Sequence, residues 1–312
     1  MAQRSLAAAS PRRSFGRPSR RTLTAYALLA PTLLVGALVF LYPAVWVLFL
    51  SVTNTNLEAA HGGSFVGLTN FVSLPSDAEY VSALGNTVIF TTTTVLGRLI
   101  LAMPVALLLN AAWLRRLRLS ALMRGIVMLP WVVPVVVATI GWQWIYDGSH
   151  GVLDYYLIRL GLLGAPIPFL GLPSTVWPAV DIVVIWKEFP LVAIALLAGL
   201  QSIPTDVYEA SRVDGANSWQ TFRLITMPLL RPILAVLLLM STIWTFNNFV
   251  YIALLTNGGP GYQTEVLATY VYYQAFTTYA MGYAAAVAIS MVVVLIVLGS
   301  IYLRIFESGN PA

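Results

Sequence analysis

The 312-residue sequence contains no cysteine, which excludes disulfide bonds, thiolate metal sites and cysteine nucleophiles. Charged residues are also scarce, at 9% of the chain against about 25% in a typical soluble domain. The two histidines, His61 and His150, are isolated from each other, so no metal site is expected. The sequence lacks GxxxxGK[ST], HExxH and GxSxG elements. It is therefore not expected to be an enzyme by itself.

Apolar side chains are in excess, because hydrophobic residues make up 59% of the chain. A soluble domain is typically about 45–50% apolar. A water-soluble chain of this length has no interior large enough for the surplus, so the surplus must face lipid. The composition predicts an integral membrane protein and argues against secreted, disordered, collagenous and ordinary cytosolic classes.

Six apolar runs are long enough to cross the hydrocarbon core of a bilayer, for which a helix needs about 20 residues. They cover residues 25–52, 85–111, 122–146, 176–200, 232–255 and 281–304. The first run follows basic residues, as a signal peptide does, but it is far longer than the core of about 7–15 residues that signal peptides have. The prediction is an all-α membrane protein with six transmembrane helices.

Arginines are concentrated on one side of the predicted membrane topology. The tail at residues 1–24 holds six, and the connections on the same side bring the count to fourteen, against one (Arg159) on the other side. The positive-inside rule then places both termini in the cytoplasm. A basic run can also bind nucleic acid, but one that adjoins an apolar helix suits a tail beside anionic lipid. The predicted organisation is this tail, a permease domain at residues 25–304 and a short tail at 305–312.

The cytoplasmic connection at residues 201–231 has the pattern of two short helices. A proline and two polar residues at 204–206 suit the start of a helix that runs to about Val213. Gly215 permits a bend, and Ser218 is predicted to cap a second helix whose apolar residues recur at helical spacing. The residues alone indicate either a docking element for a partner protein or an amphipathic segment on the membrane surface.

This connection resembles the EAA loop of ABC-importer permeases, in which Glu-Ala-Ala is followed by a glycine four residues later and then by a spaced Phe, Ile and Pro. Ser211 is the one departure, since alanine is usual at that position. In the family, the loop supplies the coupling helices that bind the nucleotide-binding subunit. The resemblance implies ATPase-coupling roles for Glu209, Ala210, Ser211, Asp214, Gly215, Ala216, Phe222 and Pro228.

Two further stretches resemble the carbohydrate-uptake permeases of that family, and the maltose permeases in particular. They are residues 197–204, which precede the loop, and residues 244–260, which contain WTFNNF and LLTNGGP. The resemblance covers about residues 85–304 and implies the type I ABC importer fold. The maltose permease also has additional amino-terminal spans and a large external insertion, so contacts made by that insertion are not carried over to the 53–84 loop.

Arg98, Lys187 and Glu188 lie inside predicted spans, where a charge near the bilayer centre costs about 2.5–3.5 kcal/mol. Lys187 and Glu188 are expected to point about 100° apart on a helix. Pro190 removes a backbone hydrogen bond nearby, and polar groups beside a broken helix suggest a substrate pathway. A contact with a partner permease is the alternative for this pair. Arg98 has no identifiable partner in the sequence and is expected at a subunit boundary.

The resemblance to the maltose permeases also implies a sugar site on the spans before and after the loop. The implied residues are Lys187, Glu188, Leu191, Ser241, Trp244, Thr245 and Asn248. The last four recur at spacings that place them on one helix face. Their hydroxyl and amide groups suit sugar hydroxyls, and an indole ring offers a flat face to a sugar ring. Such a stripe otherwise joins helices in a membrane, and both interpretations stay open.

The sequence therefore predicts a multi-pass permease of the bacterial inner membrane that imports a di- or oligosaccharide. Expected partners are a second homologous permease, two nucleotide-binding subunits that bind ATP and Mg²⁺, an external solute-binding protein, the sugar and membrane lipid. No nucleic acid is expected as a partner, and no cofactor or metal in the chain itself. The same machinery could instead carry a glycerophosphodiester, whose phosphate Lys187 would meet. An ion-coupled transporter would need a coupling-ion site and usually an internal repeat, and neither is evident.

Overall fold

The computed structural model describes residues 20–59, 63–117 and 119–307, which are mostly helical. These ranges contain no strand, only an isolated antiparallel bridge between Thr53 and Phe65. The chain divides into two compact units, Met1–Phe49 and Leu50–Ala312. The all-α prediction is confirmed for the part that the structure describes.

The first apolar run forms one helical segment with an irregular turn in its middle. α1 (Arg20–Gly36) passes through a π-helical turn at Ala37–Leu41 into α2 (Tyr42–Ser51). The stretch Tyr26–Ser51 is long and apolar enough to cross a membrane, and its most apolar 18-residue window contains no buried residue. The first predicted span is confirmed.

Four further long helices lie in the second unit. They are α4 (Ala78–Asn110), α9 (Val176–Ser202), α12 (Met227–Phe246) and α15 (Met281–Glu307). In the described ranges, five helices can span a membrane by length and composition, or six if one bent pair counts as a single span. α4 begins earlier than predicted, because Asp77 Oδ1 accepts hydrogen bonds from the N–H groups of Glu79 at 2.9 Å and Tyr80 at 3.3 Å. Such a cap satisfies donors that a helix start leaves free.

The third span is broken, which corrects the expectation of one continuous helix at 122–146. α6 (Ser120–Val132) and α7 (Val135–Ile145) meet at an angle of 87°. Pro134 has no N–H to continue the helical ladder, and it holds Val133 in an extended conformation (φ −60°, ψ 129°). The break is therefore a local consequence of the proline.

The fifth span ends at Phe246 and not at 255 as predicted, because two asparagines interrupt it. Asn247 Nδ2 donates to Ile243 O at 2.9 Å, and Asn248 Oδ1 accepts from the N–H of Tyr251 at 3.2 Å. Such side-chain bonds compete with the backbone ladder. The chain resumes as the separate short helix α13 (Val250–Leu255).

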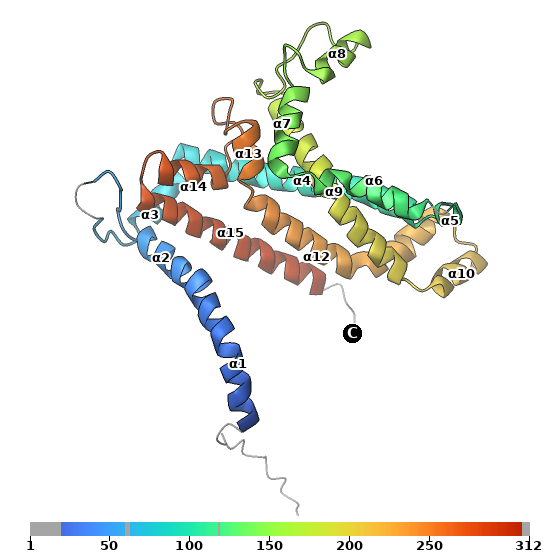
Figure 1. The fold of residues 1–312 in the computed structure, drawn as a ribbon, viewed down its shortest axis with the longest axis horizontal. Coiled ribbons are helices and arrows are strands. Elements are labelled where there is room, and N and C mark those ends of the chain that lie inside the picture. The colour runs from blue at the N-terminus through green and yellow to red at the C-terminus, as the bar shows by residue number, and fades with distance from the viewer. Residues whose placement is uncertain (1–19, 60–62, 118, 308–312) are drawn as a thin grey trace, which may run out of the picture. The chain divides into compact units, whose positions relative to one another are not determined.

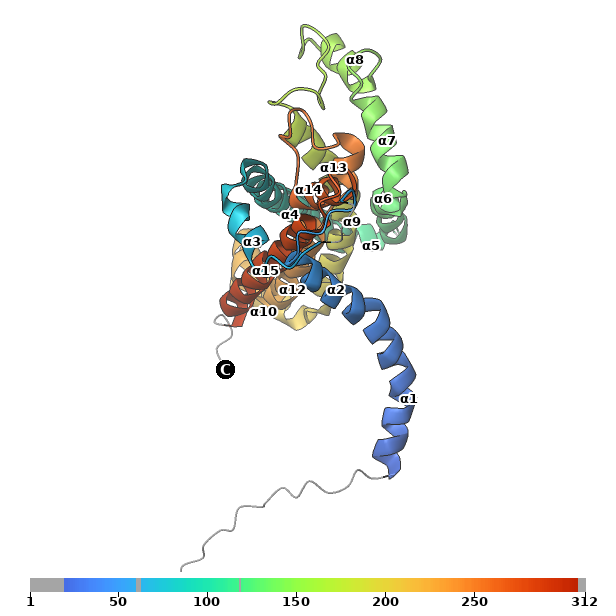
Figure 2. The same ribbon diagram turned by 90° about the vertical axis from the view of Figure 1, so that its left-hand side faces the viewer.

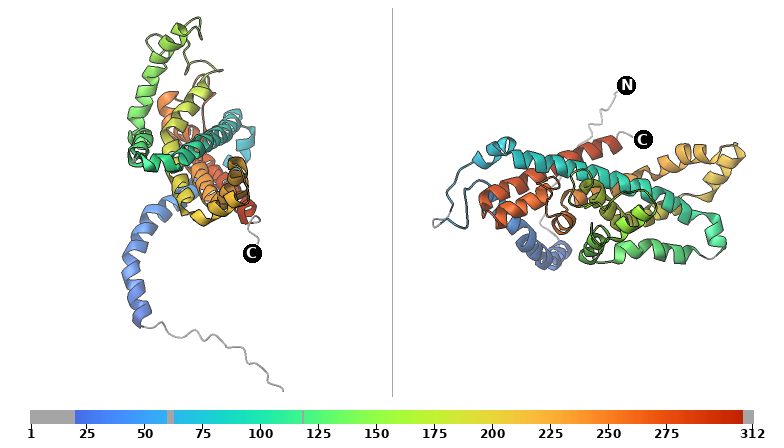
Figure 3. Two further views of the ribbon diagram at one scale, coloured as in Figure 1. Left: turned by 90° about the vertical axis from the view of Figure 1, so that its right-hand side faces the viewer. Right: turned by 90° about the horizontal axis from the view of Figure 1, so that it is seen from above.

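Short helices form most of the connections. They are α3 (Thr69–Ser73), α5 (Ala112–Arg116), α8 (Val152–Arg159), α10 (Thr205–Val213), α11 (Ser218–Thr221) and α14 (Leu267–Phe276). Within the second unit, α10 and α14 lie at opposite ends (Figures 1 and 3). α8 projects beyond α7, on the side away from α10 (Figure 2).

α4 runs through all three hydrophobic clusters of the second unit. Tyr80 and Ala83 pack with α14 and α15 near its beginning. Phe90 packs with α9 and α13 in its middle. Ala102 and Ala106 pack with α9 and with Leu230 of α12 toward its end. The helix is therefore the central element around which the other spans assemble.

Candidate coupling surface and substrate pathway

α10 ends in a bend that depends on one glycine. Gly215 has a φ of +78°, a left-handed conformation that residues with a Cβ rarely adopt. Its N–H donates to Arg212 O at 3.1 Å, and the N–H of Ala216 donates to Ser211 O at 2.9 Å. These two bonds form a Schellman motif, which satisfies the last carbonyls of the helix. The bend predicted at Gly215 is confirmed.

Asn217, and not Ser218 as predicted, caps the second short helix. Asn217 Oδ1 accepts from the N–H of Gln220 at 2.9 Å, and Gln220 Oε1 accepts from the N–H of Asn217 at 2.8 Å. This reciprocal capping box requires an acceptor at both positions, and a glutamine three residues after the asparagine supplies it. A π-helical turn at Phe222–Thr226 then leads into α12, where Pro228 lies in the first turn.

Most residues with implied coupling roles lie at the surface of this bend. Glu209, Ala210, Asp214, Gly215 and Pro228 are exposed, Ala216 and Phe222 are half-buried, and Ser211 is buried. The Ser211 hydroxyl donates to Tyr208 O at 2.8 Å, so it is used within α10. The apolar side chains of Val213 and Trp219 are 88% and 66% exposed in the same region. The bend therefore presents polar and apolar groups together, as docking surfaces do.

Two grooves flank α10, and Tyr208 and Arg212 line both of them. Leu107 of α4 contributes to one groove, and Asn110 at the end of α4 contributes to the other. The end of the central helix α4 therefore lies directly beside the 201–231 connection.

Lys187 and Glu188 face different neighbours, as their angular separation predicts. Lys187 is buried, and its Nζ donates to Trp131 O at 2.8 Å. That carbonyl belongs to the last turn of α6, where the break leaves carbonyls without helical donors. Glu188 is half-buried, and its Oε1 accepts from the Tyr251 hydroxyl at 2.6 Å. Both charged side chains thus have partners inside this chain.

The four residues predicted on one face of the fifth span are separated by the structure. Ser241 and Thr245 are buried in α12, whereas Trp244 is 58% exposed. Asn248 lies beyond the end of α12 and is half-buried. The prediction of one shared helix face is therefore wrong for Asn248, and Trp244 lies at the exposed edge of that face. On the preceding span, Leu191 is half-buried.

Arg98 has a partner that the sequence did not identify. It is 4% exposed, and its Nη2 donates to Thr245 Oγ1. It also interacts electrostatically with Glu188 and Tyr251. The expectation that Arg98 lacks a partner in this chain is wrong, because its partner lies 147 residues away on another span. No local pattern marks either Thr245 or Tyr251 as its neighbour.

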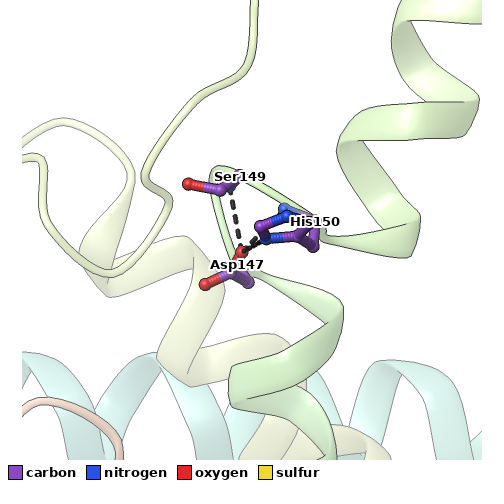
Figure 4. A network of polar contacts seen from close by, with 3 residues as sticks. All are labelled: Asp147, Ser149 and His150. Carbon is purple, nitrogen blue, oxygen red and sulfur yellow. Dashed lines mark hydrogen bonds and ion pairs between the residues drawn. The ribbon is translucent and has the colours of Figure 1, made fainter.

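The chain turns sharply after α7 at Asp147 (Figure 4). Asp147 Oδ1 accepts from the N–H groups of His150 at 2.7 Å and Ser149 at 3.0 Å, and these two bonds lower the pKa of Asp147. His150 Nδ1 lies 3.7 Å from the same oxygen, with its ring almost fully exposed. The arrangement is a turn built by an aspartate side chain. In the ranges that the structure describes, no three metal-binding side chains gather at one point.

Comparison with known families identifies the family to which this helical fold belongs. Residues 99–309 match the family described as the binding-protein-dependent transport system inner membrane component, which is well over half of the chain. The chain belongs to this family of ABC-importer permeases. The helical fold described above is accordingly that of a type I importer permease, and the chain is a multi-pass permease subunit and not the ATPase itself.

Individual relatives match this permease over almost its whole length. It is 34% identical to the trehalose/maltose transport system permease protein MalF of Thermococcus litoralis, over 92% of this chain and 94% of that protein. It is 32% identical to the sulfoquinovosyl glycerol transport system permease protein SmoG of Agrobacterium fabrum, over 92% of both chains. It also superposes on a chain of a bacterial alginate ABC transporter solved with an alginate pentasaccharide-bound periplasmic protein. That superposition has a TM-score of 0.78 and 27% identity, and it covers 91% of this chain and 93% of that one.

Proposed function

We propose that this permease forms half of the translocation pathway of an ATP-driven importer for a di- or oligosaccharide in a bacterial inner membrane. The observation that carries the cargo class is the likeness to transporters named for trehalose and maltose, for sulfoquinovosyl glycerol and for alginate, all of which are sugars or glycosides. A second homologous permease would complete the pathway. An external solute-binding protein would deliver the sugar, and two nucleotide-binding subunits would bind ATP and Mg²⁺.

The 201–231 connection is the proposed contact with one nucleotide-binding subunit. Its support is the exposed bend between α10 and α11, which presents Glu209 and Asp214 beside the apolar side chains of Val213 and Trp219. This connection and both termini are proposed to lie in the cytoplasm. The support for that orientation is the arginine asymmetry of the sequence.

The proposed sugar contacts are Trp244, Asn248 and Leu191. Trp244 and Asn248 flank the end of α12, and both retain exposed surface, as does Leu191 on α9. Ser241, Thr245 and Lys187 are buried within this chain, so their surroundings favour packing roles. Glu188 is already bonded to Tyr251. The pathway surface therefore centres on the break after Phe246.

The cargo is tested with the complete complex in proteoliposomes. ATP-dependent uptake is measured for a panel of disaccharides, oligosaccharides, glycosyl glycerols and glycerophosphodiesters, each with its binding protein. We expect uptake of at least one di- or oligosaccharide and none of the glycerophosphodiesters, because the Lys187 ammonium is buried and bonded to Trp131 O. Uptake restricted to a phosphodiester would overturn the sugar assignment while leaving the importer assignment intact.

Substitutions at the proposed pathway surface should lower transport without uncoupling the ATPase. Trp244→Ala removes the ring face, and Asn248→Ser removes the amide while keeping a hydroxyl to cap α13. Losing a polar partner costs about 1–3 kcal/mol, a factor of roughly 5 to 150 in affinity. We expect a higher half-saturating sugar concentration and unchanged basal ATP hydrolysis.

Ile296→Ala is the control, because Ile296 is 63% exposed on α15, a helix that carries none of the proposed sugar contacts. If Trp244→Ala and Asn248→Ser instead reduce the amount of assembled complex, while the surviving complex transports like the wild type, both residues are packing residues.

A further inference from the structure

The break between α12 and α13 is bonded on both sides to a charged residue of another helix. Before the break, Thr245 Oγ1 accepts from Arg98 of α4. After the break, the Tyr251 hydroxyl donates to Glu188 of α9 at 2.6 Å. A cation and an anion on two neighbouring spans thus each bind one end of the interruption at Asn247–Phe249.

The two charged side chains interact electrostatically, although no ion pair joins them. Arg98 is buried, and its Nε has no hydrogen-bond partner among the described residues. No carboxylate oxygen in the described part of the chain lies within 4.0 Å of Arg98, yet its guanidinium interacts electrostatically with Glu188. A charge in a membrane span is costly when it is alone and much less so beside an opposite charge.

The helices that carry the two charges form one packed unit. At Gly97, next to Arg98, an added Cβ would lie 2.2 Å from Ile185 Cδ1 of α9, so α4 and α9 approach closely there. Phe90 of α4 and Val183 of α9 also share one buried cluster with Tyr251. The α4–α9 contact therefore holds the two charged side chains relative to each other, and α12 and α13 meet at the break between them.

We propose that Arg98 and Glu188 are positioning residues that act as a charge-paired clamp on the α12–α13 break. α13 is held to α7 by a hydrogen bond from Gln143 Nε2 to Leu254 O at 2.6 Å. By fixing Thr245 and Tyr251, the clamp sets the direction of α13 and hence its contact with α7. This inference concerns the position of α13 and does not depend on a sugar being the cargo.

The charge pairing is tested with a double-mutant cycle on the assembled complex. Arg98→Met and Glu188→Met should each lower the melting temperature, because each leaves one buried charge without its counterpart. The melting temperature of the double variant should fall by less than the sum of the two single decreases, since this variant leaves no unpaired charge. If a single variant fails to assemble, the amount of complex in the membrane serves as the readout of the same cycle. Losses that simply add would overturn the pairing.

The positioning role is tested by cross-linking, which a purely stabilising role would not affect. Gln143→Cys and Leu254→Cys introduce a thiol pair into a chain without cysteine, and a short bifunctional thiol reagent reports the distance between α7 and α13. The cross-linking rate should fall several-fold in Thr245→Val and in the double Arg98→Met/Glu188→Met variant, even where stability is recovered.

Thr94→Val is the matched control for Thr245→Val. Thr94 is equally buried, but its hydroxyl bonds only to carbonyls of its own helix, at 2.6 Å for Phe90 O. Its cross-linking rate should equal that of the parent. A double variant that cross-links at the parental rate would overturn the clamp. Both readouts are independent of the transported solute, so a wrong cargo assignment would not affect them.

Discussion

At the scale of single residues, Gly282 allows a loop to cross the start of α15. A Cβ at this position would lie 2.0 Å from Thr53 O, and the Gly282 N–H donates to Thr55 O at 2.9 Å. Gly282→Ala should therefore destabilise the complex by about 1–3 kcal/mol, as overpacking does, and lower its melting temperature. Gly299→Ala on the same helix meets no atom within 4 Å and should be neutral or slightly stabilising. Equal melting temperatures would contradict the close approach.

Glu265 is a buried carboxylic acid outside the predicted spans, and it should make stability depend on pH. Burial, together with the charge of Glu79, raises its pKa from 4.5 to about 7. Because the folded-state pKa is the higher one, the stabilisation is fully present below pH 4.5 and is lost as the pH rises through about 7. Glu265→Gln should remove this part of the dependence, measured as melting temperature against pH.

Glu58→Gln is the control for that measurement, because Glu58 is an exposed acid in another loop. If the melting temperatures of the wild type and of Glu265→Gln change with pH in the same way, Glu265 makes no contribution to the pH dependence and the raised pKa is contradicted.

At the scale of elements, the proposed coupling role of the bend after α10 depends on one backbone conformation, that of Gly215. No atom lies within 4 Å of a Cβ built at Gly215, so a substitution there strains only the backbone. A left-handed conformation costs a residue with a Cβ about 1–2 kcal/mol. Gly215→Val should therefore reduce co-purification of the nucleotide-binding subunit and slow transport, with membrane insertion unchanged.

Gly215→Asn should retain most of the coupling, because asparagine tolerates the left-handed conformation. If the Gly215→Val complex assembles and transports as well as the wild type, the coupling role assigned to this bend is wrong.

Sequence patterns predicted which helices exist better than where they end. Hydropathy located the spans because an uninterrupted run of about 20 apolar residues is rarely anything other than a transmembrane helix. The breaks depend on single residues: Pro134 interrupts the third span, and two asparagines end α12. Asn217 caps α11 through a reciprocal bond with Gln220. Asparagine and serine are both common capping residues, so the sequence alone did not distinguish Asn217 from the neighbouring Ser218.

At the scale of the whole molecule, the proposed membrane orientation rests on arginine counts and is directly testable. Because the chain has no cysteine, single cysteines can be introduced at exposed positions without background. Glu58→Cys and Gln263→Cys should react with a membrane-impermeant thiol reagent on intact spheroplasts, and Val213→Cys and Gln220→Cys only after permeabilisation. Labelling at position 213 in intact spheroplasts would show that the orientation is the opposite of the proposed one.

Contacts between distant spans were beyond the reach of sequence patterns. The 201–231 connection could be singled out from the sequence because its residues are contiguous and carry a family resemblance. The bond between Arg98 and Thr245 joins residues 147 positions apart, and periodicity within one helix contains no information on its neighbour. For the same reason the sequence indicated that Lys187 and Glu188 diverge, but not that they bind Trp131 and Tyr251.

α4 is a single helix that connects the two ends of the second unit. Its 33 residues extend about 50 Å at 1.5 Å per residue. Near one end, Asn86 Nδ2 donates to Glu265 O at 2.9 Å and Thr87 Oγ1 accepts from the N–H of Leu267 at 2.8 Å. At the other end, Asn110 lines a groove beside α10. α4 continues through Pro104 as one helix, so a single element joins the groove beside α10 to the loop that contains Glu265. If the bend after α10 receives a push from the nucleotide-binding subunit, α4 is the route by which we expect that push to reach the loop.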